Sequence, residues 1–403
     1  MVSVGRRRVL AALGSVAVAG CSGISSSDEP EELTWTVEDG PATVTARSDG
    51  SESEGWPMAD YDAAATATAP AGHGPSSFPL EEQWSYASPL AQAETPIVAD
   101  GTVVVPLSGG GLVALNAASG DEQWQATRGS YAGGLPAVAD DTIVLRSDIA
   151  TGHHLDAVDL ADGSRQWQAD AVDESGEKTR LVVADRLVYD VRRTTLTVWD
   201  LVTGERCTRL RLSGTAFGIT GLAVADGTVY LTTEEVVGDE VSSRGVVAFD
   251  PQRGAVDWTY RDGGIGDITV VDGTIYVVVG DRLQALATDT GDEVWHVDTD
   301  NYSPSVTAAA DRLLVTDRES VTAFATDGGE EQWRRTDVGT NAVIRAGETV
   351  FAVGGTQWEL HALGADDGAT RWRENLIWEA TSAAVADGTL FVVNAEGQVY
   401  AYA

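Results

Sequence analysis

The side chains that could carry acid–base or metal chemistry are few and scattered along this chain. The five histidines are His73, His153, His154, His296 and His361, and the two cysteines are Cys21 and Cys207. In an extended chain His153 and His154 would point to opposite sides, so the two rings could not readily share a metal ion. No nucleophile elbow, zinc-binding helix motif or phosphate loop occurs, so the sequence predicts no catalytic residue and no metal site.

Carboxylates are abundant, and we expect most of them to lie on the protein surface rather than in a binding site. The 403 residues include 62 Asp and Glu against 26 Lys and Arg, a formal charge of −36 at pH 7, and Lys178 is the one lysine. In molar salt the Debye length is about 3 Å, so repulsion between surface charges is screened while the carboxylates keep the surface hydrated. We therefore expect a halophilic, archaeal source and no binding of nucleic acid.

The elements that must position these side chains form one repeated pattern. In its clearest copy two apolar runs flank an Asp-Gly turn at Asp100, a third run follows at Leu112–Asn116, and a fourth carries Trp124. Four short strands joined by hairpins, recurring about every 40 residues, are typical of propeller blades. We name these strands A to D in chain order.

The turn aspartate and the strand tryptophan both recur along the chain. The aspartates are Asp100, Asp140, Asp185, Asp226, Asp272, Asp311 and Asp387, and the tryptophans are Trp84, Trp124, Trp167, Trp258, Trp295, Trp333 and Trp372. Ala346 takes the place of one further aspartate, and the copy that contains Cys207 lacks its tryptophan. Since these residues repeat, we interpret them as scaffold, with each tryptophan packed between neighbouring blades.

The offset between the two sets predicts how the ring closes. The Trp84 strand precedes every Asp-Gly turn, and the last unit, Ala383–Ala403, stops before its own tryptophan strand. If the Trp84 strand completes that last blade, the ring closes and only short strand edges remain. The sequence therefore predicts an all-β, eight-bladed β-propeller over residues 56–403, with four antiparallel strands per blade. Seven blades would result if the Cys207 unit is misread.

The N-terminus has the composition of an export signal. Arg6, Arg7 and Arg8 precede the apolar stretch Val9–Ala19, which is too short to span a membrane. The segment that begins at Arg6 and Arg7 resembles a twin-arginine signal. We therefore assign residues 1–20 to a signal that is removed on export.

The residues after the signal resemble a lipoprotein anchor. Val18–Cys21 is similar to the lipobox of prokaryotic lipoproteins, which implies that Cys21 carries lipid. The acidic segment 21–55 then reads as a disordered tether, with a loose strand or two possible within Leu33–Ala46. This predicts a protein that touches the membrane through its lipid alone, on the extracellular face of the cytoplasmic membrane. An ordinary cleaved signal is the alternative.

The repeats resemble a known family. Segments 157–167, 248–258 and 285–295 share the spacing Ala-x-Asp/Ala-x-x-x-Gly-x-x-x-Trp. This spacing is similar to the tryptophan-docking repeat of pyrroloquinoline quinone (PQQ) enzymes, which also builds the non-catalytic BamB-type assembly lipoproteins. Trp56–Asp62 resembles the lead-in segment of such propellers, which implies that it lies against the ring. WD40 repeats fit less well.

The resemblance leaves several functions open. Quinoprotein dehydrogenases hold PQQ and Ca²⁺ with Glu, Asn and Asp and cover the cofactor with an adjacent Cys-Cys ring, and no segment here matches those positions. Our leading hypothesis is therefore a monomeric scaffold that binds cell-envelope proteins, without catalysis or cofactor. The alternative is a small quinoprotein-like oxidoreductase binding PQQ and Ca²⁺, and a third possibility is a carbohydrate- or polymer-binding module.

The position of the longer loops suggests where partners bind. The tight A–B and C–D turns share one face of the ring, the turn face, and the B–C and D–A connections share the other, the loop face. Ser147–His154, Val172–Arg180 and Thr233–Gly245 are expected loops of the loop face, which we predict to be the binding surface. Polar residues near the starts of A strands could line the channel mouth there: Arg180, Asp267, Asn341 and Glu379.

Overall fold

The structure is a computed structural model. It describes residues 35–39, 55–88, 92–108, 111–126, 130–131, 135–149, 152–171, 179–212, 217–237, 240–261, 267–279, 282–299, 305–316, 319–354 and 358–403. The chain divides into two units, Met1–Leu33 and Thr34–Ala403, and every described residue belongs to the second. The predicted export signal with Arg6 and Arg7, the predicted lipidation site Cys21 and most of the predicted tether lie outside the described residues, as do residues 172–178 of the predicted loop Val172–Arg180. None of the described residues forms a helix that could span a membrane.

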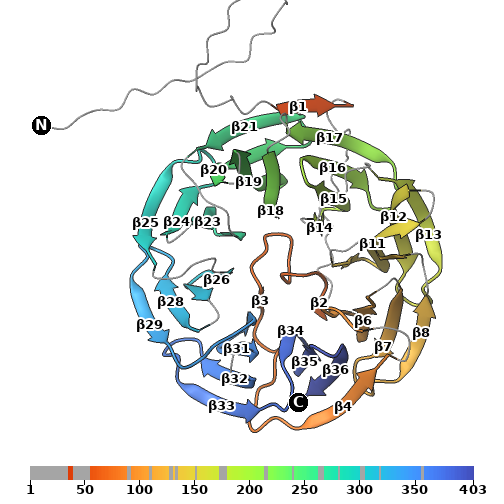
Figure 1. The fold of residues 1–403 in the computed structure, drawn as a ribbon, viewed down its shortest axis with the longest axis vertical. Coiled ribbons are helices and arrows are strands. Elements are labelled where there is room, and N and C mark those ends of the chain that lie inside the picture. Colours follow the sequence, from red (N-terminus) through yellow and green to blue (C-terminus); the bar gives the residue numbers. More distant parts are fainter. Residues whose placement is uncertain are drawn as a thin grey trace, which may run out of the picture. The chain divides into compact units, whose positions relative to one another are not determined.

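The second unit is a ring of eight antiparallel sheets (Figure 1), which confirms the predicted eight-bladed β-propeller. The first four blades are β5 (Ile97–Ala99), β6 (Thr102–Pro106), β7 (Leu112–Asn116), β8 (Glu122–Ala126); β10 (Ala137–Ala139), β11 (Thr142–Ile149), β12 (Gly152–Asp159), β13 (Arg165–Asp170); β14 (Thr179–Ala184), β15 (Leu187–Arg192), β16 (Thr195–Asp200), β17 (Arg206–Leu212); and β18 (Phe217–Ala225), β19 (Thr228–Val237), β20 (Glu240–Asp250), β21 (Ala255–Tyr260). Strand β9 (Ser130–Tyr131) also pairs with β11.

Blades 5 to 8 complete the ring. They are β22 (Ile268–Val271), β23 (Thr274–Val279), β24 (Arg282–Ala287), β25 (Glu293–Asp298); β26 (Ser305–Ala309), β27 (Arg312–Thr316), β28 (Val321–Ala325), β29 (Glu331–Arg335); β30 (Ala342–Ala346), β31 (Thr349–Gly354), β32 (Glu359–Gly364), β33 (Thr370–Asn375); and β34 (Ala380–Ala386), β35 (Thr389–Asn394), β36 (Gln398–Tyr402), β4 (Glu82–Ala87). In blade 8 Trp84 of β4 lies opposite Ala401 of β36. The N-terminal strand therefore closes the ring as predicted.

Tight A–B hairpins form because their turn residues tolerate a left-handed backbone. The turn aspartates with positive φ are Asp100 (46°), Asp140 (49°), Asp185 (50°), Asp226 (49°), Asp272 (48°) and Asp387 (48°). Positive φ matches the two-residue turns that best fit the right-handed twist of the strands. In blade 3 the second turn residue is Arg186 instead of glycine, with φ of 62°, a conformation that is unfavourable for a side chain with a Cβ.

The repeated tryptophans join neighbouring blades. Six of them donate their indole N–H to a carbonyl of the next blade: Trp84 to Ala117 (2.9 Å), Trp124 to Leu160 (2.8 Å), Trp167 to Leu201 (2.8 Å), Trp258 to Thr288 (2.9 Å), Trp295 to Thr326 (3.0 Å) and Trp333 to Ala365 (2.9 Å). A glycine of the next C–D turn lies flat against each ring. A Cβ on Gly291, for example, would lie 2.4 Å from Trp258. Only glycine therefore allows the turn to pack this closely against the tryptophan ring.

Blade 3 lacks this tryptophan, and a fifth strand lies on its outer edge. The residue opposite Val198, in the tryptophan position, is the buried Thr208. Strand β1 (Trp35–Glu38) pairs antiparallel with β17, and Trp35 packs against the core of this blade. Strand β1 lies within Leu33–Ala46, the part of the acidic segment 21–55 in which the sequence allowed a strand.

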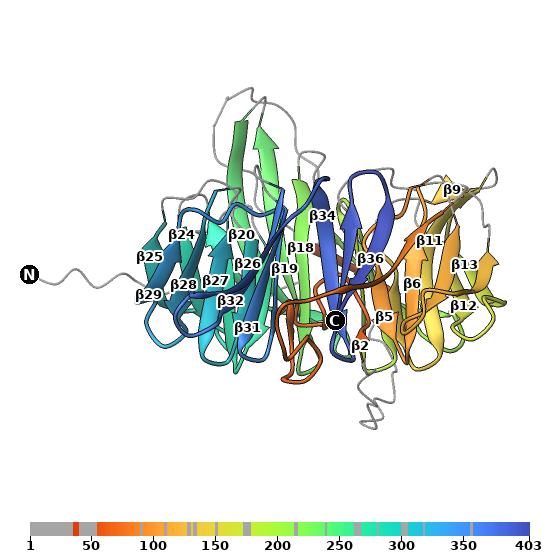
Figure 2. The ribbon, with the colours of Figure 1, turned by 90° about the horizontal axis from the view of Figure 1, so that it is seen from below.

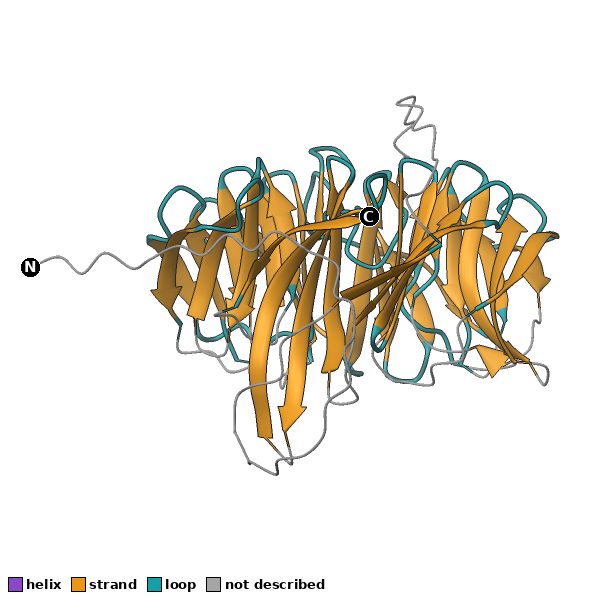
Figure 3. Ribbon diagram, turned by 90° about the horizontal axis from the view of Figure 1, so that it is seen from above, coloured by secondary structure: helices purple, strands orange, loops and turns teal. Residues whose placement is uncertain are grey.

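Two of the loops predicted on the loop face are instead parts of paired β-strands. Ser147 pairs with His154 inside the β11–β12 hairpin, and Thr233 pairs with Gly245 inside the β19–β20 hairpin. The predictions of B–C loops over Ser147–His154 and Thr233–Gly245 are therefore wrong, because strand pairing continues beyond the ring. The β19–β20 hairpin projects from one face of the ring, opposite the short turns (Figures 2 and 3).

Candidate functional site

The segment Gly55–His73, which we call the plug, crosses the central channel of the ring (Figure 1). It enters as β2 (Gly55–Trp56), antiparallel to β5, and continues into β3 (Thr68–Ala69), parallel to β30. The resemblance to quinoprotein-type propellers implied that Trp56–Asp62 would lie against the ring. The structure places this segment inside the ring, among the A strands.

Five blades hold the plug through the same backbone position of their A strands. The hydrogen bonds run from Val138 N–H to Pro57 O (2.8 Å), Val224 to Ala63 (2.6 Å), Val270 to Ala64 (3.0 Å), Ala308 to Thr66 (2.8 Å) and Arg345 to Ala67 (3.0 Å). These N–H groups sit on the open inner edge of each sheet, so the plug carbonyls satisfy donors that would otherwise be buried without partners. The chain thus fills its own channel with a segment fixed by its main chain.

The plug keeps a strained backbone. Tyr61, Ala65 and Ala67 have positive φ values of 72°, 58° and 49°, and such conformations persist where surrounding contacts enforce them. One contact is internal: the Asp62 carboxylate accepts hydrogen bonds from the Thr66 N–H (2.9 Å) and hydroxyl (2.8 Å). Burial raises the pKa of Asp62, and the hydrogen bonds from Thr66 partly oppose that rise.

The predicted channel-mouth residues form two separate pairs. Arg180 donates to Asp267 (2.8 Å) and also to Asp60 of the plug (2.9 Å), so one guanidinium bridges two carboxylates. The Asn341 side-chain amide donates to Glu379 (3.1 Å) between blades 7 and 8. Burial raises the pKa of Asp60; the Arg180 charge opposes this rise and the neighbouring Asp267 adds to it. The bridge ties the plug to blade 3, which donates no backbone hydrogen bond to it among the described residues.

A buried ionic cluster between blades 2 and 3 was missed by sequence reasoning. Arg146 of β11 bonds Asp190 of β15 (2.6 Å), and Arg192 bonds the same carboxylate (3.0 Å). Burial opposes ionisation of Asp190, but the two guanidinium groups outweigh it and lower the pKa of this carboxyl. The signal was present in the sequence, since charged residues occupy otherwise apolar B strands. Pairing between distant strands could not be deduced from that signal.

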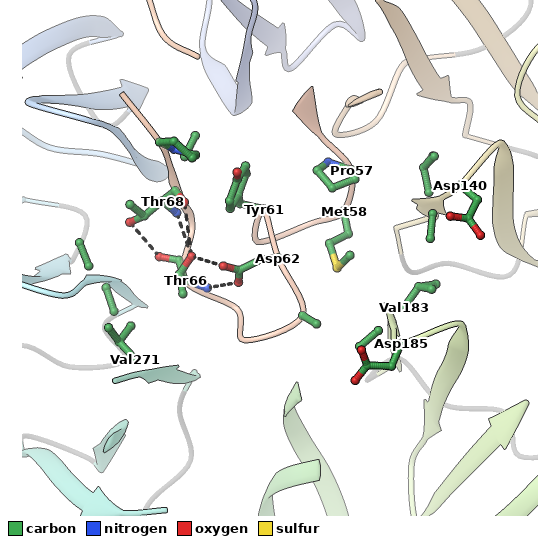
Figure 4. Close-up of a pocket in the computed structure, with 18 of the residues that line it drawn as sticks. Pro57, Met58, Tyr61, Asp62, Thr66, Thr68, Asp140, Val183, Asp185 and Val271 are labelled. Carbon is green, nitrogen blue, oxygen red and sulfur yellow. Dashed lines mark hydrogen bonds between the residues drawn. The ribbon is translucent and has the colours of Figure 1, made fainter. Parts of the chain in front are cut away.

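A pocket of about 710 Å³ lies beside the plug at the turn-face end of the channel (Figure 4). Met58 and Tyr61 of the plug form one wall, and A-strand ends such as Val138, Val183 and Ala308 form the other. Its polar rim contains Asp62, Asp140, Asp185 and Arg186, and Arg186 lies 3.9 Å from Asp140. A smaller pocket of about 160 Å³ adjoins Arg180 at the other end of the A strands. Partner binding on the loop face remains a prediction.

The residues of the large pocket do not suit the cofactor of the PQQ enzymes. PQQ is a tricarboxylate, whereas this pocket offers three carboxyl groups and one guanidinium, so charges of like sign would meet. The described residues also contain no group of three or more His, Cys, Asp or Glu placed to hold a metal ion. We therefore derive no step through PQQ or Ca²⁺.

Fold and site together define a class: a β-propeller built from tryptophan-docking repeats, with a channel closed by its own chain. The family model described as outer membrane protein assembly factor BamB matches residues 151–265, 216–317 and 317–403. The matched segments cover more than half of the chain, which therefore belongs to this family.

Individual relatives are distant. The outer membrane protein assembly factor BamB of Salmonella typhimurium is 29% identical over 139 residues, which span 33% of this chain and 35% of that protein. The match thus covers about a third of that relative. Among solved structures, BamB from Moraxella catarrhalis has a TM-score of 0.62 at 19% identity, covering 81% of this chain and 98% of that one. A quinohemoprotein alcohol dehydrogenase from Comamonas testosteroni has a TM-score of 0.65 at 14% identity, covering 89% and 81%. These two similarities show the fold alone.

Proposed function

We propose that this chain is a lipid-anchored scaffold on the extracellular face of the cytoplasmic membrane, where it binds other cell-envelope proteins without catalysing a reaction. The observation that carries the proposal is the plug, whose main chain accepts hydrogen bonds from five blades. With the plug held across the channel, the outer faces of the ring and the pocket at the turn-face end of the channel are left for recognition. Membership of a family described as an assembly factor supports the same role.

The β19–β20 hairpin is the feature of the loop face best suited to contact a partner. Paired strands run from Thr228 to Val237 and from Glu240 to Asp250, and they extend past the other blades (Figure 2). A paired hairpin holds its backbone in place before binding, so less conformational entropy is lost when a partner docks.

The test compares the full chain with a variant whose hairpin is shortened. Thr233 and Gly245 are register partners, so residues 234–244 can be replaced by an Asn-Gly turn without changing the pairing below them. Both proteins would be expressed with the native leader, cross-linked in cells and recovered from membranes. We expect specific cross-links to envelope proteins that the shortened variant loses, while its melting temperature stays within a few degrees.

Two further measurements address the other parts of the proposal. Mass spectrometry of the mature protein should find lipid on Cys21, and Cys21→Ser should release the protein from membranes. Calorimetric titration with PQQ and Ca²⁺ in molar KCl should give no saturable heat. Saturable, Ca²⁺-dependent binding would instead support an oxidoreductase, and identical cross-links with and without the hairpin would refute binding through the loop face.

A further inference from the structure

One A strand exposes a backbone position that the plug covers elsewhere. In blade 4, Val224 pairs with Val229 next to the turn pair Ala225 and Thr228, and its N–H points inward to the plug. In blade 3, Val183 pairs with Val188 next to the turn pair Ala184 and Leu187. Along an antiparallel strand, the N–H and C=O groups of one residue bond the partner strand and those of the next residue point away from it. Because Val183 and Val224 occupy the same register position, the N–H and C=O of Val183 face the channel as those of Val224 do.

The plug supplies no acceptor to Val183. Among the described residues, five A strands donate this N–H to the plug and blade 1 pairs with β2, but no bond of this kind forms at Val183. The matching residue of blade 8, Val385, is completely buried and does not line the pocket. Val183 lines the large pocket (Figure 4). The pocket therefore contains an open strand edge, a feature to which extended peptides add by main-chain hydrogen bonds.

The side chains around this edge define the chemistry of a ligand. Met58, Val138 and Leu201 line the pocket with apolar surface, which suits small apolar side chains. Asp62 and Asp185 add carboxyl groups to the rim, and the one arginine that lines the described pocket, Arg186, lies beside Asp140, so carboxyl groups outnumber guanidinium groups there. A volume of about 710 Å³ is large for a pocket and has room for a short run of peptide.

We propose that this pocket binds an extended peptide segment of a partner protein, with a basic side chain between small apolar ones. A peptide carbonyl accepts from the Val183 N–H, the peptide N–H donates to the Val183 carbonyl, and the basic side chain lies at the Asp185 end. The inference rests on the proposed binding role only in that the partner is a protein. The pocket opens on the turn face, away from the β19–β20 hairpin.

The test uses two blocked peptides, acetyl-Ala-Val-Lys-Val-Ala-amide and its Glu counterpart. The full chain would be titrated with each peptide by NMR in molar KCl, and hydrogen exchange of the Val183 amide would be followed. We expect the Lys peptide to bind saturably and to slow hydrogen exchange of the Val183 amide at least about fivefold. It should also bind at least about threefold tighter than the Glu peptide. This difference in affinity is small because molar salt screens every charge pair that is further apart than the Debye length. Absence of saturable binding, unchanged exchange or equal affinities would overturn the proposal.

Proline variants isolate the backbone bond. Val183→Pro removes an N–H that carries no strand bond, a position where an edge strand tolerates proline, and Val183→Ala keeps the N–H. We expect about tenfold weaker peptide binding for Val183→Pro and less than a twofold change for Val183→Ala. Equal binding by the two variants would contradict the proposal, and the exchange measurement on the unchanged chain decides if Val183→Pro does not fold.

A matched control comes from blade 5. Val270→Pro removes the equivalent N–H that bonds Ala64, and neither residue lines the pocket, so this variant should lower the melting temperature while leaving peptide binding unchanged. The two proposals can also fail separately: loss of peptide binding with intact envelope cross-links removes this pocket only, while the scaffold role stands.

Discussion

Blades 3 and 4 are neighbours with the same four-strand topology, yet they differ at every level of packing. On the inner edge, Val224 of blade 4 bonds the plug, whereas Val183 of blade 3 lines a pocket. In the interior, the fully buried Leu231 of blade 4 occupies the position of Asp190 in blade 3. On the outer edge, blade 4 docks Trp258 against blade 5, while blade 3 carries Thr208 and the added strand β1.

This difference distinguishes a blade whose core and edges serve the scaffold, blade 4, from a blade that also lines the candidate site, blade 3. Blade 4 uses the interactions that most of the ring repeats, and such interactions stabilise the fold wherever they occur. Among the described residues, blade 3 instead has an ion cluster, a guanidinium bridge to the plug and a fifth strand on its outer edge, next to β17. A unique set of contacts in a repeat protein is where selection for binding can act without disturbing closure of the ring. The following variants test whether those contacts differ in energy as they do in geometry.

The largest effect is expected for Asp190→Leu, which gives blade 3 the interior residue of blade 4. Arg146 and Arg192 would keep buried charges without their carboxylate, so the free energy of unfolding should fall by about 3–5 kcal/mol. Replacing Arg146, Asp190 and Arg192 together by Met, Leu and Met should recover most of the lost stability, because no buried charge then remains. Denaturant unfolding in molar KCl measures both, and a single variant as stable as the unchanged protein would show that the cluster carries little energy.

The same cluster predicts a pH dependence. The folded-state pKa of Asp190 is lowered, so its contribution is complete above the ordinary pKa of aspartate, about 4, and is lost as pH falls through the lower folded-state value. The stability difference between the unchanged protein and Asp190→Leu should therefore shrink below about pH 4. A constant difference from pH 7 to pH 3 would argue against an ionised Asp190.

The second effect compares two glycines in equivalent turns. A Cβ on Gly291, at φ of 68°, would lie 2.4 Å from Trp258 of blade 4. Gly254, in the C–D turn of blade 4, has a φ of 62°, but the neighbouring D strand of blade 3 carries Thr208 instead of tryptophan. We expect Gly291→Ala to cost about 3 kcal/mol from strain and overpacking, and Gly254→Ala to cost about 1 kcal/mol from strain alone. Equal losses in thermal unfolding would mean that tryptophan docking does not distinguish these junctions.

The third effect concerns strand β1. Trp35 packs on the blade 3 core, so Trp35→Ala should lower the free energy of unfolding by about 2 kcal/mol, roughly half the loss for a fully buried tryptophan. The exposed neighbour Thr36 is the control, and Thr36→Ala should change stability by less than about 0.5 kcal/mol. If both variants unfold at the same denaturant concentration, β1 does not compensate for the missing docking tryptophan.

The smallest effect is expected at the plug bridge. The side chains of Arg180 and Asp60 are 33% and 40% exposed, so Asp60→Asn should change stability by less than about 1 kcal/mol at pH 7. Because burial raises the folded-state pKa of Asp60, the contribution of Asp60 is full below the unfolded-state pKa and is lost as pH rises through the folded-state value. The unchanged protein should thus gain stability relative to Asp60→Asn as pH falls from 7 to 4, and the opposite trend would contradict the direction of this shift.

The repeated part of the fold was predictable and the unique part largely was not. The aspartate turns and the Trp84 strand predicted eight blades and the manner of closure, since each repeat supplied the same local information. The degenerate repeat that contains Cys207 still forms a blade, so the seven-blade alternative is wrong, and strand register places Thr208 in the tryptophan position. The channel-mouth prediction named Arg180 and Asp267, which the structure brings together, but the plug residue Asp60 was missed because no periodicity marks an irregular segment.

The sequence by itself determined the type of fold, because hairpin turns, alternating strands and packed tryptophans are local features that repeat along the chain. Only the tertiary structure decided which segment fills the channel and which strand edge stays open. Those outcomes depend on the backbone of Gly55–His73 meeting residues tens to hundreds of positions away. Main-chain hydrogen bonds do not depend on side-chain type, so residue patterns carry no record of them.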